Sequence, residues 1–86
     1  MLEEEIKKAL KKGKVIIGFK KSLKYIKMNK PQLVVIAKNI QEDRKKEIEY
    51  LAKIGKFEVK IFDGTSKELG IVCGKPFPIS TLVIKK

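Results

Sequence analysis

The sequence has no histidine, no tryptophan and one cysteine among its 86 residues. Without histidine, neither a Ser-His nor a Cys-His nucleophile pair can form, and a single cysteine excludes an internal disulfide and a Cys/His zinc site. Phosphate-binding loops are also missing, because Gly13-Lys14, Gly18 and Gly74-Lys75 lack the other residues of such motifs. We therefore expect no enzyme, no metal and no cofactor, in a reducing, cytoplasmic setting.

Long apolar runs are absent, and none approaches the roughly 20 residues of a membrane span. The start of the chain, Met1 to Glu5, lacks the basic and apolar regions of a signal peptide. We expect no membrane association. The length and a hydrophobic content of 43% are instead typical of one globular domain, here residues 1–86.

Acidic residues are scarce, since 21 Lys and Arg outnumber 10 Asp and Glu and give a net charge of +11. Most of the excess lies in residues 11–40, which contain nine lysines and no acidic residue. The alternative explanation is a general lysine-rich bias of the proteome, but such a bias would add acidic residues beside the lysines. The one-sided distribution therefore predicts a basic face and a polyanionic partner such as nucleic acid.

The hydrophobic pattern alternates between helical and strand-like segments. It predicts helices over 2–12, 18–28, 42–54 and 66–73, and strands over 15–17, 33–37, 57–62 and 79–84. Thr65 and Glu68 form a capping-box pattern, and Gly55 is the expected end of the third helix. We expect Cys73 to be a buried residue. The order predicts an α/β fold: a three-layer α/β/α sandwich with one mixed four-stranded sheet.

The second predicted helix carries the candidate site. Phe19, Leu23 and Ile26 share one face and form the predicted buried stripe. Lysines 20, 24 and 27 line a second, exposed face, and Lys21, Ser22 and Tyr25 are expected on the polar side. A strand that ends at Gly18 and leads directly into a helix presents unpaired backbone N–H groups and a partial positive charge. We expect Lys20, Lys21, Ser22 and Lys24 to bind a nucleic-acid backbone there.

Two other segments are expected near this helix start. Lys38-Asn39 follows the strand 33–37, and the loop from Gly74 to Pro78 precedes the last strand. Loops at the carboxyl ends of strands gather at one edge of an α/β sheet. Asn39 is either a base-reading amide or a cap and turn residue, and Phe77 either stacks on an unpaired base or faces the core. A compact site of this kind favours a distorted RNA feature over a long duplex.

Several motifs together point to a known family. They are Gly18-Phe19-Lys20-Lys21-Ser22, the run from Leu33 to Asn39, Glu47 to Ala52, Glu68-Leu69-Gly70, and Gly74-Lys75-Pro76-Phe77. In their order and spacing, the chain resembles the kink-turn-binding ribosomal protein superfamily, and most closely its thirty-e branch from archaea and eukaryotes. The sister branch, seven-A-e, typically has Asn-Glu where this chain has Lys20-Lys21.

The resemblance implies a non-enzymatic RNA-binding protein of the large ribosomal subunit. Such proteins bind kink-turn-like internal loops through tandem sheared G·A pairs. By position, Gly18 and Lys20 would lie against the RNA, Lys21 and Lys24 near phosphates, and Asn39 and the Gly74–Phe77 loop at the bulged side. Phe19 is counted in the same candidate site. We expect a monomer when free. The alternatives are a stand-alone kink-turn protein of another ribonucleoprotein, such as an RNA-modification guide, and a basic domain that binds an acidic protein.

Overall fold

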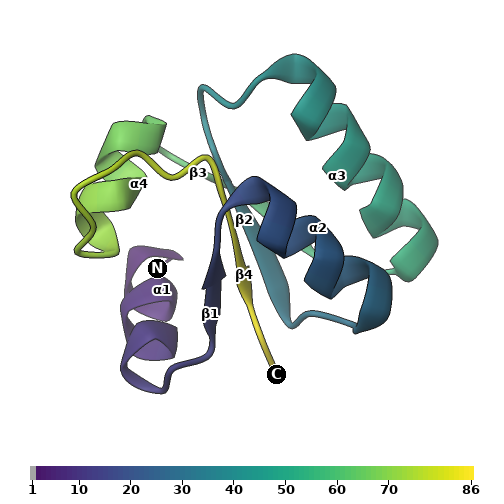
Figure 1. Cartoon of the computed structure of the whole chain (residues 1–86), viewed down its shortest axis with the longest axis horizontal. Coiled ribbons are helices and arrows are strands. Elements are labelled where there is room, and N and C mark those ends of the chain that lie inside the picture. Colours follow the sequence, from purple (N-terminus) through teal and green to yellow (C-terminus); the bar gives the residue numbers. More distant parts are fainter. Residues whose placement is uncertain (1) are drawn as a thin grey trace.

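The computed structural model describes residues 2–86, in which helices and strands alternate (Figure 1). The elements are α1 (Leu2–Lys11), β1 (Val15–Ile17), α2 (Phe19–Met28), β2 (Leu33–Ala37), α3 (Glu42–Gly55), β3 (Val59–Phe62), α4 (Ser66–Val72) and β4 (Thr81–Ile84). The predicted order is confirmed. The last two strands begin two residues later than the sequence pattern predicts, at Val59 and Thr81.

The four strands form one mixed sheet in the order β1-β4-β2-β3. β4 runs antiparallel to both β1 and β2, and β2 runs parallel to β3. Every residue of β2 and β4 is buried, which confirms 33–37 as a central strand. Because β1, β2 and β3 share one direction, their carboxyl ends lie at the edge where β4 begins.

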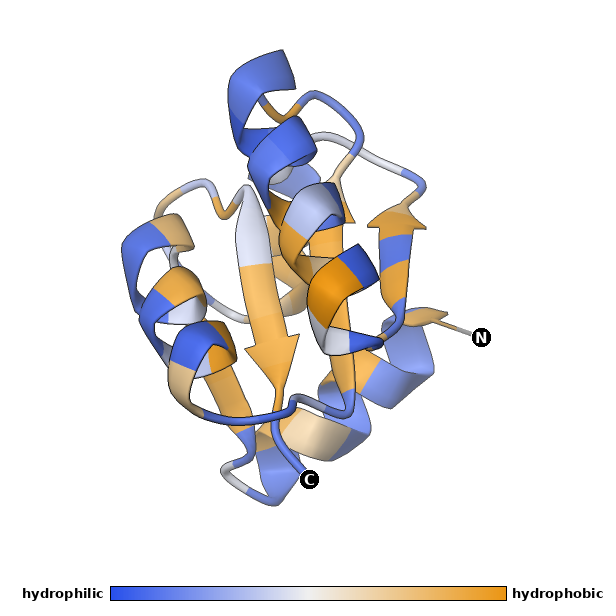
Figure 2. Cartoon of the chain, turned by 90° about the vertical axis from the view of Figure 1, so that its right-hand side faces the viewer, coloured by the Kyte–Doolittle hydropathy of each residue, from blue (hydrophilic) through white to orange (hydrophobic). Residues whose placement is uncertain are grey.

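Helices cover both faces of the sheet, α1 and α4 on one side and α2 and α3 on the other (Figure 1). Alternate residues of β2 therefore enter two different cores. Leu33, Val35 and Ala37 pack with Ile6 of α1 and Leu69 of α4. Val34 and Ile36 instead pack with Ile48 of α3 and with partly buried residues of α2, among them Phe19, Leu23 and Ile26. Figure 2 shows the apolar strands between helices whose outer faces are hydrophilic.

Two helix ends show how local sequence sets the fold. The predicted capping box is confirmed: Thr65 Oγ1 accepts the Glu68 N–H at 3.3 Å, and Glu68 Oε1 accepts the Thr65 N–H at 3.2 Å. The predicted role of Gly55 is wrong, because α3 includes it and Lys56 takes the left-handed conformation, with φ 53°. A Cβ on Gly55 would lie 3.1 Å from the Phe57 ring, so this glycine makes room for that ring.

None of the helices within residues 2–86 combines the length and the apolar character that crossing a bilayer requires.

Candidate nucleic-acid interface

Gly18 joins β1 to α2 through a turn that favours glycine. Its φ is 109° and its ψ 146°, a conformation that side-chain-bearing residues rarely adopt. Its N–H donates to the Thr81 carbonyl at 3.0 Å, and its carbonyl accepts the Ser22 N–H at 2.9 Å. Among the described residues, no side-chain hydrogen bond caps the helix start. The first-turn amides of α2 are therefore held against β4 and left for an external acceptor.

The other two predicted segments lie at the same sheet edge. The Ala37 N–H donates to the Ser80 carbonyl at 2.8 Å, and the Lys38 N–H donates to the Gly64 carbonyl at 2.9 Å. These bonds place the end of β2 between the start of β4 and the turn after β3. The structure thus brings together the helix start, the segment Lys38-Asn39 and the loop before β4, as the sequence predicts.

A hollow of about 540 Å³ lies between the helix start and the loop Gly74–Pro78. It is lined by Ile17, Gly18, Phe19, Lys21, Arg44, Lys75, Phe77, Pro78, Ile79 and Ser80. Three of these residues are cations and none carries a carboxylate. The hollow therefore has the charge that a phosphate backbone requires and apolar walls beside it.

Phe77 projects from the loop and is 49% exposed. The core-facing alternative is therefore wrong. The backbone of the loop packs closely against α4, because a Cβ on Gly70 would clash with the Phe77 carbonyl oxygen. Gly74, Lys75 and Pro76 are also exposed. The ring remains free to stack on a planar partner.

Arg44 belongs to this hollow, although the sequence pattern gives no indication of it. It lies in the first turn of α3, and its guanidinium carbon is 4.8 Å from the centre of the Phe19 ring. A guanidinium stacks on an aromatic face and still donates hydrogen bonds at its rim. The one feature of the sequence that could have marked this residue is its type, because Arg44 is the single arginine among 21 basic residues.

Ser22 is not on the exposed face where the sequence pattern placed it. The residue is fully buried, and within residues 2–86 its hydroxyl has no hydrogen-bond partner. Position 22 lies three residues after Phe19, so it belongs to the inward stripe. Its side chain is therefore not available to a ligand in this fold. Tyr25, predicted on the same polar side, is half-buried against the α2–α3 core. Lysines 20, 21, 24 and 27 are exposed as predicted.

Asn39 connects two loops at the interface. Its Oδ1 accepts the Ser66 N–H at 2.8 Å, which ties β2 to the start of α4. The cap and turn role is therefore present, and it uses the oxygen of the amide. The neighbouring Lys38 ammonium lies 3.9 Å from the Asp63 carboxylate, and both side chains are strongly exposed. Such a pair contributes little and leaves the lysine accessible.

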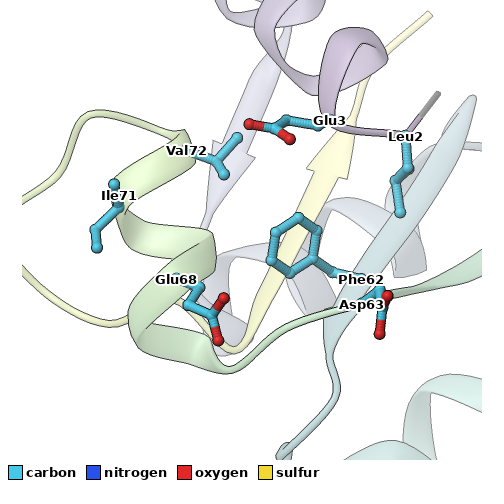
Figure 3. Close-up of a pocket in the computed structure, with 7 residues that line it drawn as sticks. All are labelled: Leu2, Glu3, Phe62, Asp63, Glu68, Ile71 and Val72. Carbon is cyan, nitrogen blue, oxygen red and sulfur yellow. The ribbon is translucent and has the colours of Figure 1, made fainter.

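A second hollow, on the α1–α4 side, has the opposite charge. It encloses about 500 Å³ and is lined by Leu2, Glu3, Phe62, Asp63, Glu68, Ile71 and Val72 (Figure 3). Three carboxylates repel a polyanion, so this hollow is not a nucleic-acid site.

Cys73 is buried on the same side, as predicted. Burial raises the pKa of its thiol, and nearby Lys75 opposes this only in part. The pKa is therefore raised overall, less thiolate is present, and the thiol is a weak nucleophile.

A family model described as the ribosomal protein L7Ae/L30e/S12e/Gadd45 family matches residues 1–86. The chain belongs to this family. It is 45% identical over 84 residues to large ribosomal subunit protein eL30 of Methanothermobacter thermautotrophicus, covering 98% of this chain and 86% of that protein. The eL30 protein of Saccharolobus solfataricus is 44% identical over 82 residues, with 95% and 76% coverage. Both relatives are named as proteins of the large ribosomal subunit.

The fold also matches a solved RNA-binding protein. The 15.5kD RNA binding protein of Giardia lamblia superposes with a TM-score of 0.87 at 20% sequence identity, over 99% of this chain and 71% of that one. At this identity the likeness establishes the fold alone. The α/β/α sandwich expected from the sequence is therefore the fold of the L7Ae family.

Proposed function

We propose that this chain is an RNA-binding protein of the large ribosomal subunit that recognises a kink-turn-like internal loop of ribosomal RNA. The relatives named eL30 support the ribosomal assignment. The observation that carries the proposal is the hollow between Gly18 and Phe77, with its cations, its open helix start and its exposed aromatic ring.

The start of α2 would bind the RNA backbone. Gly18 has no Cβ, so a phosphate or ribose can approach the first-turn amides closely. Lys20, Lys21 and Lys24 are exposed on the same helix and supply positive charge. In this proposal Lys20 and Lys21 contact phosphates, because ammonium groups lack the acceptors that an Asn-Glu pair offers to base edges.

The opposite wall would hold the bulged nucleotides. Phe77 offers a ring for stacking on an unpaired base, and Gly74, Lys75 and Pro76 precede it in the same exposed loop. Arg44, stacked on Phe19, presents donors to the same hollow. Asn39 would use its amide nitrogen as a donor, since its oxygen is bound to Ser66.

This arrangement suits a sharply bent RNA better than a straight duplex. Gly18, Lys21, Arg44, Lys75 and Phe77 line one hollow, so these contact groups are gathered in one place and do not follow a long groove. Sequence-specific RNA recognition also favours bulges and loops, whose bases are available for stacking. A kink-turn with sheared G·A pairs is the bent RNA that the family resemblance implies.

The test is a titration of the protein with a kink-turn RNA and with a matched, fully paired duplex at several salt concentrations. We expect tight binding to the kink-turn and weak binding to the duplex. The logarithm of the affinity should fall linearly with the logarithm of the salt concentration, with a slope that reflects a few phosphates. Equal affinity for both RNAs would contradict the kink-turn assignment and leave a general polyanion binder.

Fractionation separates the ribosomal function from a stand-alone ribonucleoprotein. We expect the protein in the cytoplasmic fraction, where it should cosediment with large ribosomal subunits at high salt. When free, it should be monomeric by light scattering. Recovery with small guide RNAs instead would favour the alternative of an RNA-modification particle.

A further inference from the structure

The ends of α2 and α3 that lie far from Gly18 expose two large apolar side chains. Met28, the last residue of α2, is 73% exposed, and Ile54, near the end of α3, is 61% exposed. Between the two helix ends lies a hollow of about 260 Å³, lined by Ile26, Lys27, Met28, Asn29, Lys30, Gly55 and Phe57. We call Met28, Ile54, Phe57 and their neighbouring lysines 27, 30, 53 and 56 the distal patch.

This exposure is a feature of the helix surface and not a gap in the core. Ile48 supplies the buried face of α3 with no exposed area. Ile54 follows it by six residues, so its side chain leaves the helix on a different face. Single exposed apolar residues are common, but here Met28 lines a hollow together with half-buried Phe57, and exposed Ile54 directly precedes Gly55 of the same lining.

The rim of the distal patch is cationic. Lysines 27, 30, 53 and 56 are all exposed, and none of them forms an ion pair within the described part of the chain, residues 2–86. The acidic residues of the same segments are Glu49 and Glu58. Positive charge therefore exceeds negative charge around an apolar centre, the usual anatomy of a protein interface with a polar rim. Charge complementarity requires an acidic partner.

RNA is acidic but fits the centre of this patch poorly. Met28 and Ile54 are aliphatic and offer no ring for base stacking. The C-terminal turns of α2 and α3 also present carbonyl groups, which need N–H donors and which repel phosphates. A protein segment supplies apolar side chains, carboxylates and backbone N–H groups together.

We infer that the distal patch docks an acidic protein segment in which carboxylates flank an apolar anchor. The helix α2 has ten residues, so the patch lies about 15 Å along the helix axis from Gly18. Both surfaces can therefore be occupied at once. The protein then links an RNA at one end to a protein at the other, and this inference does not depend on which RNA is bound.

The test is an NMR titration of the whole chain with a short peptide in which Asp and Glu flank Leu and Phe. Two control peptides replace Leu and Phe by Ser, or the acids by Lys, and a fully paired RNA duplex is the third control. We expect the acidic apolar peptide to shift the signals of Met28, Ile54 and Phe57, while the control peptides and the duplex leave them unchanged.

Variants locate the contact. Met28→Ser and Ile54→Ser should each weaken peptide binding about fivefold. Ile71→Ser, on α4 and 67% exposed, is the matched control and should have no effect. Lys53→Glu provides a charge-reversed variant that keeps the apolar centre, and it should weaken binding as well. Absence of peptide binding, equal binding of the Ser-substituted peptide, or shifts confined to Gly18 and Phe77 would each overturn the inference. Kink-turn titration of the same samples reports the proposed RNA function separately.

Discussion

Replacing Phe77 by alanine separates binding from folding in the proposed site. The ring is 49% exposed, so the substitution removes roughly half of a phenylalanine's buried area. Full burial of such a side chain contributes about 1.5–3 kcal/mol, which sets the expected stability loss at about 1 kcal/mol. For a chain of this length, that loss corresponds to a fall in melting temperature of about 4–8 °C. A core phenylalanine would instead cost about 3–5 kcal/mol.

The expected loss of RNA affinity is larger. Stacking on a base contributes about 1–3 kcal/mol, which corresponds to about 5- to 150-fold in affinity. Both quantities are measured on the same preparation, by thermal unfolding and by titration with a kink-turn RNA at a temperature where the variant is folded. Tyr50→Ala is the control, because Tyr50 is an aromatic on α3 with 64% exposure and lies outside the hollow.

We expect Tyr50→Ala to retain wild-type affinity. If Phe77→Ala also binds the RNA like the wild type, the ring does not stack on a base. A melting temperature that falls by far more than 8 °C would show that the ring stabilises the core, against the exposure seen here.

Four further substitutions or reactions test the other elements. Lys20→Ala should weaken RNA binding and reduce the salt slope by about one charge without lowering the melting temperature, since exposed lysines add little stability; unfolding would contradict a surface role. Arg44→Lys keeps the charge but loses the stack on Phe19, so affinity should fall by about 1 kcal/mol, roughly fivefold, in the same titration. Gly70→Ala places a Cβ 2.2 Å from the Phe77 carbonyl oxygen, so the loop must move; thermal unfolding should show a loss of about 1–3 kcal/mol, accompanied by weaker RNA binding. Cys73 should react with a thiol reagent more slowly in the folded chain than in the unfolded chain at every pH below the raised pKa of the buried thiol, because less thiolate is present.

The sequence predicts most of the scaffold because its signals are local or strongly patterned. Residues 33–37 are apolar on both faces, which only a strand covered on two sides tolerates, and β2 is central and buried. Thr65 and Glu68 stand at capping-box spacing, and both hydrogen bonds form. Two segments of the candidate site meet because β1 and β2 end at the same edge of the sheet, and the loop Gly74–Phe77 joins them because the antiparallel β4 begins at that edge.

Some features depend on packing that no local pattern encodes. Ser22 is polar by identity but lies on the inward stripe, where a small side chain fits between α2 and the sheet. Arg44 reaches the site only because the start of α3 packs beside Phe19. Lys56 adopts the left-handed conformation at the end of α3, while Gly55 stays helical beside the Phe57 ring. The first two outcomes depend on contacts between residues of different segments.

The central claim is that the helix start at Gly18, the segment Lys38-Asn39 and the loop Gly74–Phe77 together bind a kinked RNA. Amide hydrogen exchange of the whole chain, free and saturated with a kink-turn RNA, tests it most directly. We predict slower exchange at these three segments in the complex, with α1 and the distal patch unchanged. Protection confined to α1 or to the ends of α2 and α3, with exchange at Gly18 and Phe77 unaltered, would contradict the account.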